Sequence, residues 1–272
     1  MNRYLLILLS LALGLPALTR AADAPDVMEI VHRANLAAYY QGKDGRAQVQ
    51  MTITDDQGRS RERRMIILRR DDADTDAIED QAYWSEQQYY VYFQRPADLN
   101  RTVFMVHKHL DSDDDRWLYL PSLDLVRRIA ATDKRSSFVG SDFYYEDVSG
   151  RNIDLDTHEL IDTTDAYYVV RSTPKDPDSV EFAWYESYIH KQSFIPVQIA
   201  FYRADGTKYR EATALEVKNI QGYPTVTRAQ MKSLDTGSTT VMEYLSVKYD
   251  LGLPREIFTE RYLRTAPREW LR

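Results

Sequence analysis

The sequence has 272 residues and a formal net charge of −7 at pH 7, and it contains 20 tyrosines but no cysteine. The missing thiols exclude disulfides, thiolate nucleophiles, zinc–thiolate sites and a lipid-bearing cysteine within these residues. The negative charge disfavours nucleic acid and anionic membranes as partners, because both repel an acidic surface.

Residues 1–21 have the features of a cleavable secretory signal peptide. A basic residue, Arg3, precedes a nearly uncharged run from Leu5 to Leu18, and the small residue Ala21 lies where a signal peptidase cuts. A retained membrane anchor is the alternative, but the run is shorter than the ~20 residues that a spanning helix needs. We therefore predict cleavage after Ala21, a periplasmic location, and one mature domain over residues 22–272.

The mature chain is expected to begin with an amphipathic helix over residues 25–41. Pro25 suits the first turn, Gly42 can end the helix, and apolar residues recur at helical spacing at Val27, Ile30, Val31, Ala34 and Ala38. The helix therefore has one apolar face to bury.

After Gly42 the apolar residues alternate with polar ones, which predicts β-strands. A hairpin spans residues 46–67, and further strands are predicted at 88–94, 102–108, 116–120, 125–129, 153–161, 166–172, 180–189, 193–203, 208–218, 225–233 and 239–249. The connections are too short for crossover helices, so neighbouring strands should pair antiparallel. The predicted fold class is mainly β (α+β): a single curved antiparallel sheet forming a half-open barrel. Helix 25–41 would be its lid, and 138–147 and 254–263 its shorter helical pieces.

Alternation also selects a set of side chains that could line a cavity inside this barrel. They are Val49, Met51, Ile53, Met65, Ile67, Val91, Phe93, Ile195, Val197, Ile199 and Phe201. Tyrosines cluster at Tyr83, Tyr89–Tyr92 and Tyr144–Tyr145. A tyrosine has a broad apolar face and a polar tip, which suits the wall of a cavity for an amphiphile, although ordinary cross-strand packing explains any single one.

The sequence offers one weak metal candidate and no catalytic motif. His107 and His109 share one face of a predicted strand, but a calcium loop starting at Asp111 would have Arg116 where glycine is needed and Ser122 where glutamate is needed. An exposed acidic turn is the plainer interpretation. The motifs of serine hydrolases, zinc proteases, phosphate loops and dinucleotide sites are absent, so we predict no catalytic residue, metal or cofactor.

Four segments carry a resemblance to a known family. They read FQRPAD at 93–98, DRWLYLP at 115–121, VRRI at 126–129 and FVGSDFYYED at 138–147. Their order and wording resemble the outer-membrane lipoprotein-sorting family, a LolA-like group of periplasmic proteins, and the resemblance extends over essentially the whole mature chain. It implies an incomplete antiparallel barrel of the LolA/LolB type, whose helical lid encloses an apolar cavity for acyl chains.

The residues of the matched motif have two possible roles. Phe138, Gly140, Ser141, Asp142 and Phe143 either form a tight turn that places the phenylalanines in the core or contact the ligand. A further hypothesis is a lid latch, in which charge-assisted hydrogen bonds join Arg127, Arg128 and Asp147.

Three functions remain open at this point. The first is a non-enzymatic carrier of a lipid, a lipoprotein acyl chain or another hydrophobic cargo, working with an RND-type exporter or an outer-membrane acceptor. The second is an envelope adaptor that binds a transporter or an outer-membrane partner through its surface. The third is an enzyme with two carboxylates in the barrel mouth, which would need converging acids with raised pKa values.

Overall fold

The computed structural model describes residues 25–72 and 86–272. The predicted signal peptide over residues 1–21, most of the acidic stretch 71–81 and Tyr83 lie outside the described residues. No helix in the described ranges is long and apolar enough to cross a membrane.

The described strands form one antiparallel sheet, as predicted from the alternation. Along the chain they are β1 (Asp44–Thr54), β2 (Ser60–Asp71), β3 (Gln87–Arg95), β4 (Val103–Lys108), β5 (Asp115–Leu120), β6 (Leu125–Ile129), β7 (Asp156–Thr163), β8 (Tyr167–Pro174), β9 (Trp184–His190), β10 (Pro196–Tyr202), β11 (Lys208–Ile220), β12 (Tyr223–Ser233) and β13 (Thr239–Tyr249). Their spatial order is β6-β5-β4-β3-β2-β1-β13-β12-β11-β10-β9-β8-β7. The two edge strands, β6 and β7, are therefore consecutive in the chain.

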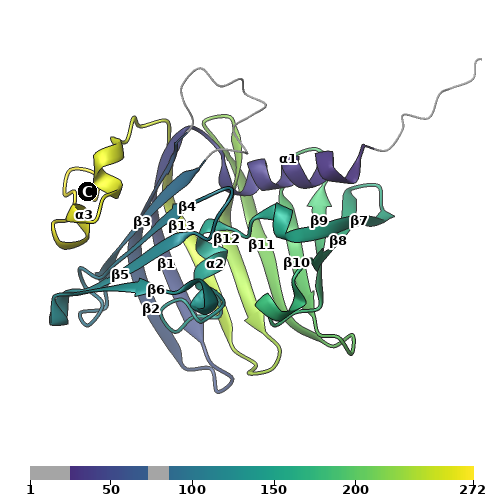
Figure 1. Ribbon diagram of the computed structural model, residues 1–272, viewed down its shortest axis with the longest axis horizontal. Coiled ribbons are helices and arrows are strands. Elements are labelled where there is room, and N and C mark those ends of the chain that lie inside the picture. Colours follow the sequence, from purple (N-terminus) through teal and green to yellow (C-terminus); the bar gives the residue numbers. More distant parts are fainter. Residues whose placement is uncertain (1–24, 73–85) are drawn as a thin grey trace, which may run out of the picture.

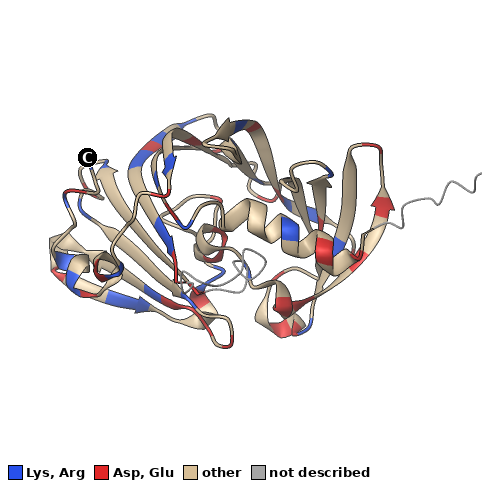
Figure 2. Ribbon diagram, turned by 90° about the horizontal axis from the view of Figure 1, so that it is seen from above, with Lys and Arg blue, Asp and Glu red and all other residues tan. Residues whose placement is uncertain are grey.

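The sheet curves around the helix α1 (Val27–Tyr39), as Figures 1 and 2 show. Register shifts at Gln48/Val49, Arg64/Met65 and Phe201/Tyr202 interrupt the strand pairing, and such bulges increase local bending and twist. The prediction of a half-open barrel with a helical lid is confirmed.

The lid helix α1 lies within the predicted range 25–41 and buries the predicted face. Ile30, Val31 and Ala34 pack against Val170 and Phe194, so α1 covers the end of the sheet that includes β7 and β8. Full burial of an aliphatic side chain contributes roughly 1.5–3 kcal/mol, which makes tertiary packing the main support of this helix.

The connection between the two edge strands crosses the open side of the half-barrel. This crossing segment, residues 130–155, contains the short helix α2 (Tyr145–Ser149). Its Phe138 is 1% exposed and packs against the rings of Phe93, Phe104 and Tyr145. The predicted helical piece 138–147 is correct only for its last residues, because Val139 and Gly140 have positive φ values of 47° and 78° that no α-helix accommodates.

The C-terminal residues 250–272 cover the outer face of the first half of the sheet. They include a short 3-10 turn (Arg255–Phe258) and the helix α3 (Arg261–Arg264), within the predicted piece 254–263 and just beyond it. Leu253, Phe258 and Leu263 pack there against Leu68 and Tyr90. Strands β2–β4 are therefore buried on both faces, which accounts for their nearly continuous apolar runs.

Candidate functional site

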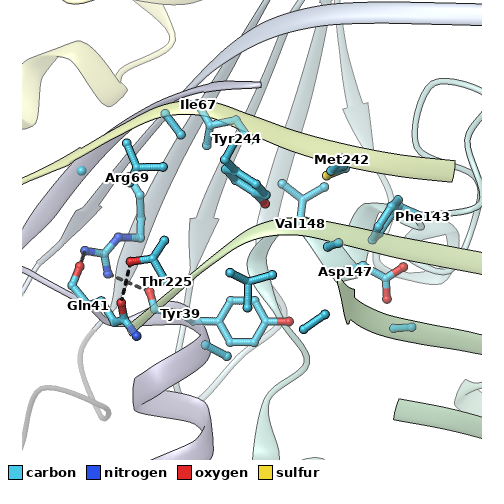
Figure 3. A pocket seen from close by; sticks show the side chains of 18 of the residues that line it. Tyr39, Gln41, Ile67, Arg69, Phe143, Asp147, Val148, Thr225, Met242 and Tyr244 are labelled. Carbon is cyan, nitrogen blue, oxygen red and sulfur yellow. Dashed lines mark hydrogen bonds between the residues drawn. The ribbon is translucent and has the colours of Figure 1, made fainter. Parts of the chain in front are cut away.

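A cavity of about 310 Å³ lies between the inner face of the sheet, the end of α1 and the crossing segment (Figure 3). This volume is at the lower end of the range for small-molecule sites, roughly 300–1,000 Å³. Most of the wall is apolar, and examples of its residues are Ile67, Val91, Phe143, Val148, Met242 and Val247. A cavity of this kind favours an apolar guest over water.

The structure divides the cavity residues that were selected from the sequence into two groups. Ile67, Val91, Ile195 and Ile199 line the cavity. The other group lies in packed regions: Val49, Met51, Ile53, Met65 and Phe93 form the core with Phe138, and Phe201 packs with Phe182 and Tyr209. The crossing segment fills the first of these regions.

Val197 does not line the cavity, because the strand is irregular at this point. The pairing of β10 with β9 shifts register between Pro196 and Gln198, and Pro196 joins the lining in its place. A bulge breaks the alternation of side chains between the two faces, so counting every second residue from Ile195 selects the wrong one.

Sequence reasoning missed the contribution of β11, β12 and β13 to the wall. Ala212, Ala229, Met242 and Tyr244 line the cavity. The alternation on these strands was visible, but small residues such as alanine give no sign of which face is inward. Tyr39 and Gln41, at the end of α1, also line the cavity. The helical pattern placed them in the last turn of the predicted helix but did not indicate that they face a cavity.

Arg69 holds the C-terminal end of α1 against the sheet. Its guanidinium donates hydrogen bonds to the carbonyl oxygens of Tyr39 (2.7 Å), Gln41 (2.7 Å) and Gly42 (2.6 Å), and it pairs with Asp71 at 2.9 Å. These carbonyls have no partner further along the helix, so the cation also complements the helix dipole. Burial raises the pKa of Asp71 to about 6, although the Arg69 charge and a hydrogen bond from Gln87 oppose this rise.

A second polar group lies where α1 meets β12. Gln41 donates to the carbonyl oxygen of Ala37 at 2.6 Å and also to that of Pro224. The Thr225 hydroxyl lies 2.9 Å from the Tyr249 hydroxyl and 3.4 Å from Oε1 of Gln41. These side chains satisfy one another, and they join the end of the lid to the sheet (Figure 3).

The motif turn of the crossing segment is held by hydrogen bonds on both sides. The Ser141 hydroxyl donates to the carbonyl oxygen of Phe138 at 2.7 Å. The Thr240 hydroxyl donates to the Asp142 carboxylate at 2.7 Å, which ties the turn to β13. Phe138 lies in the core and both phenylalanines border the cavity, so the motif forms the tight turn, and its contact with a ligand stays a prediction.

The latch predicted for Asp147 has a different partner. Asp147 pairs with Arg210 of β11, and its carboxylate also accepts a hydrogen bond from the backbone N–H of Tyr144 at 2.6 Å. Arg127 and Arg128 lie instead on the exposed edge strand β6, where they pair with Asp133 and Asp115. Arg210 could not be selected from the sequence, because only the folded sheet brings β11 under the crossing segment.

Further ion pairs join the crossing segment to the second half of the molecule: Arg135 binds Glu181 at 2.5 Å and Arg151 binds Asp156 at 2.9 Å. Arg135 also binds Glu146 at 3.0 Å, within the crossing segment itself. Burial would raise the pKa of Glu181, but the hydrogen bond and charge of Arg135 outweigh it and hold that pKa below its ordinary value. These carboxylates are engaged by arginines, which gives a structural account of the acidic residues in this region.

The histidines of the weak metal candidate have protein partners. His107 Nε2 lies 2.6 Å from the carbonyl oxygen of Phe258, and His109 lies between Glu86 and Asp115. Within residues 25–72 and 86–272, no three potential metal ligands are grouped so that they could hold an ion.

A curved antiparallel sheet with a helical lid and an apolar cavity is a LolA-like fold, the fold that the resemblance implied. The similar solved structures include a DUF1329 family protein from Desulfovibrio piger (24% identity, TM-score 0.76, 86% of this chain and 96% of that chain). They also include a protein from Vibrio parahaemolyticus described as an outer membrane lipoprotein-sorting protein domain (24%, 0.76, 87% and 97%) and a LolA superfamily protein from Nitrosomonas europaea (20%, 0.67, 88% and 100%).

The chain belongs to the family whose model, with the description "Uncharacterized protein", matches residues 85–265. No curated protein matches the sequence. At these identities the solved structures establish the fold.

Proposed function

We propose that this protein is a non-enzymatic carrier of the bacterial periplasm. It binds a lipid, a lipoprotein acyl chain or another hydrophobic cargo in the cavity and passes it between components of the envelope. The single observation that carries the proposal is the apolar cavity between the sheet and its lid. Burial of one methylene group contributes about 0.8 kcal/mol, so even a short length of acyl chain would bind without any catalytic group.

The arrangement of the lid supports this proposal. Arg69 holds α1 through carbonyl oxygens at the end of the helix, and a helix end can fray without loss of the core. The crossing segment is tied independently through Asp147 and Arg210. Opening of α1 alone would expose the cavity while the rest of the half-barrel remains folded.

The route of the cargo is part of the proposal. A signal peptide over residues 1–21 would deliver the chain to the periplasm as a single domain. An inner-membrane exporter of the RND type would supply the cargo, or an outer-membrane acceptor would receive it. The Vibrio relative is described as an outer membrane lipoprotein-sorting protein domain, which is consistent with this route.

The experiment is native mass spectrometry of the protein purified from the periplasm, followed by organic extraction and lipid analysis. Wild type should carry a stoichiometric lipid or acylated molecule. Ala212→Trp should lose it, because the indole would fill the cavity, whereas Leu215→Trp on the same strand should keep it, because Leu215 is exposed. A clean apo mass that incubation with lipids does not change would contradict the carrier function.

A second candidate is an envelope adaptor, and an exposed apolar surface favours it. Leu215 and Val217 of β11 and Leu245 of β13 are 41%, 42% and 53% exposed. β12 lies between these two strands in the sheet. Large exposed apolar side chains are typical of protein interfaces where they gather into one patch. If serine substitutions at these three positions abolish function while the purified protein keeps its lipid, the adaptor surface is needed as well as the cavity.

A further inference from the structure

A second hollow lies on the outer face of the sheet, on the side opposite the cavity under the lid. This outer pocket has a volume of about 510 Å³, and its wall includes Tyr92 of β3, Tyr119 of β5 and Leu263 of α3. All three side chains belong to the cluster that the C-terminal residues 250–272 form with the sheet. The volume is within the range for small-molecule sites, roughly 300–1,000 Å³.

The outer pocket is positively charged in a protein that is acidic as a whole. Three arginines line it, Arg101, Arg264 and Arg268, against one acid among its described lining residues, Glu269. The whole chain carries a formal net charge of −7. A local excess of cations inside a hollow raises the concentration of anions there, whatever the net charge of the molecule.

Two of these arginines have no counter-ion. In the part of the chain that the structure describes, the guanidinium groups of Arg101 and Arg268 form no ion pair and no hydrogen bond with another residue. Arg264 binds Asp124 at 3.1 Å, in a pair that is exposed on both sides. That hydrogen bond uses Nε, which leaves the two terminal nitrogens of Arg264 to donate elsewhere.

The backbone at Arg101 gives separate support for a role of its side chain. Arg101 has a φ of 70° in the turn between β3 and β4, and its N–H donates to the carbonyl oxygen of Phe93 at 2.9 Å. Glycine adopts this conformation without strain, whereas a long side chain costs roughly 1–2 kcal/mol there. The turn itself therefore does not favour arginine, and residues held in such conformations cluster at ligand sites.

We propose that the outer pocket binds an organic phosphate through Arg101, Arg264 and Arg268, with the rings of Tyr92 and Tyr119 beside its organic part. A guanidinium matches the geometry of phosphate oxygens, and a phosphate has more acceptor oxygens than a carboxylate to share among three arginines. The pocket is also larger than inorganic phosphate alone would fill. A phospholipid headgroup and a soluble organic phosphate share this chemistry. The site is separate from the cavity, so the proposal does not depend on the carrier function.

The first test is isothermal titration calorimetry with glycerol 3-phosphate. Wild type should bind it, and Arg101→Gln and Arg268→Gln should each lose about 10-fold in affinity, the order typical for a hydrogen bond to a charged group. Glu269→Gln should bind more tightly, because it removes the acid from the lining. Arg228→Gln is the matched control: Arg228 is half exposed on β12 and pairs with Glu243 at 3.3 Å, and its loss should not change binding.

Folding and the cavity are checked in the same variants. Arg101 and Arg268 are exposed, so thermal unfolding and the affinity of the cavity for a fluorescent alkyl probe should match wild type. Absence of glycerol 3-phosphate binding, or equal affinity in wild type and in the two variants, would overturn the proposal. Inorganic phosphate that binds as tightly as glycerol 3-phosphate would also overturn it, because the pocket would then hold an anion without regard to its organic part.

A vesicle experiment distinguishes the two sources of the phosphate. Wild type is sedimented with phosphatidylcholine vesicles that contain or lack phosphatidylglycerol. Binding to the anionic vesicles that Arg101→Gln/Arg268→Gln loses would support a lipid headgroup as the ligand, and would place the outer face of the sheet against the membrane. Binding of glycerol 3-phosphate without binding to these vesicles would support a soluble organic phosphate in the same pocket.

Discussion

At the scale of single residues, the crossing segment depends on one buried cation. Arg210 is 2% exposed and lies between the rings of Tyr144 and Phe201, with its Cζ 4.0 and 5.1 Å from their centroids. It donates to the carbonyl oxygen of Asp142 at 3.0 Å and pairs with the Asp147 carboxylate. A buried charge is tolerated only while its partners remain. The main energetic effect of removing Asp147 would therefore be the cost of leaving the Arg210 charge buried and unpaired, rather than the loss of the attraction between the two side chains.

We therefore expect Asp147→Asn to lower the free energy of unfolding by about 3 kcal/mol, the lower end of the cost of an uncompensated buried charge. The amide would leave Arg210 buried without a counter-ion and would weaken the hydrogen bond from the Tyr144 N–H. Urea denaturation at neutral pH measures the change.

Asp133→Asn is the matched control for this substitution. Asp133 is half exposed and lies 3.9 Å from the exposed Arg127, so its loss should cost less than about 1 kcal/mol. Equal losses in the two variants would show that the Asp147–Arg210 pair does not secure the crossing segment.

At the scale of elements, the helix α1 and the crossing segment approach each other closely at Gly150. Gly150 has a φ of 79°, and a Cβ atom placed there would lie 2.7 Å from Cζ of Tyr39. Tyr39 is the last residue of α1 and lines the cavity, so the missing side chain at Gly150 lets the crossing segment pack against the end of the lid helix.

Gly150→Ala should therefore destabilise the protein by roughly 3 kcal/mol, the sum of backbone strain at positive φ and overpacking against the ring. Gly206→Ala tests the first part alone, because Gly206 has a φ of 83° and no heavy atom within 4 Å of its added Cβ. Thermal unfolding of both variants separates strain from the clash. If Gly150→Ala loses no more stability than Gly206→Ala, the ring has space to move away and the contact is not tight.

The elements also show how far sequence alone predicts this fold. Alternation and turn residues predicted the antiparallel sheet, and helical spacing predicted α1, because both patterns are local. The strand predicted at 180–189 begins only at Trp184. Alternation of apolar and polar residues does not distinguish an extended loop that precedes a strand from the paired strand itself. The exclusion of Val197 and the partnership of Asp147 with Arg210 depend on a bulge and on distant strands, which no local pattern contains.

At the scale of the whole molecule, the sheet serves two purposes on its two faces. The inner face, with α1 and the crossing segment, holds both the core around Phe138 and the cavity. The outer face of the first half is covered by residues 250–272, which bury Leu68 and Tyr90. Because packing on the outer face contributes to the stability of the sheet, the inner face does not have to be completely packed. A binding cavity requires such incomplete packing.

This division predicts that a substitution on the outer face changes stability without changing binding. Leu263 is 1% exposed, so Leu263→Ala should lower the free energy of unfolding by about 2–5 kcal/mol, as is typical when a buried leucine leaves a cavity. Leu245→Ala should change it by less than about 0.5 kcal/mol, because Leu245 is 53% exposed. Urea denaturation measures both, and affinity for a fluorescent alkyl probe is measured below the unfolding transition. Leu263→Ala should match wild type in affinity for the probe. If its affinity falls in proportion to its stability, the two faces are coupled through the strands and the cavity depends on the packing of the outer face.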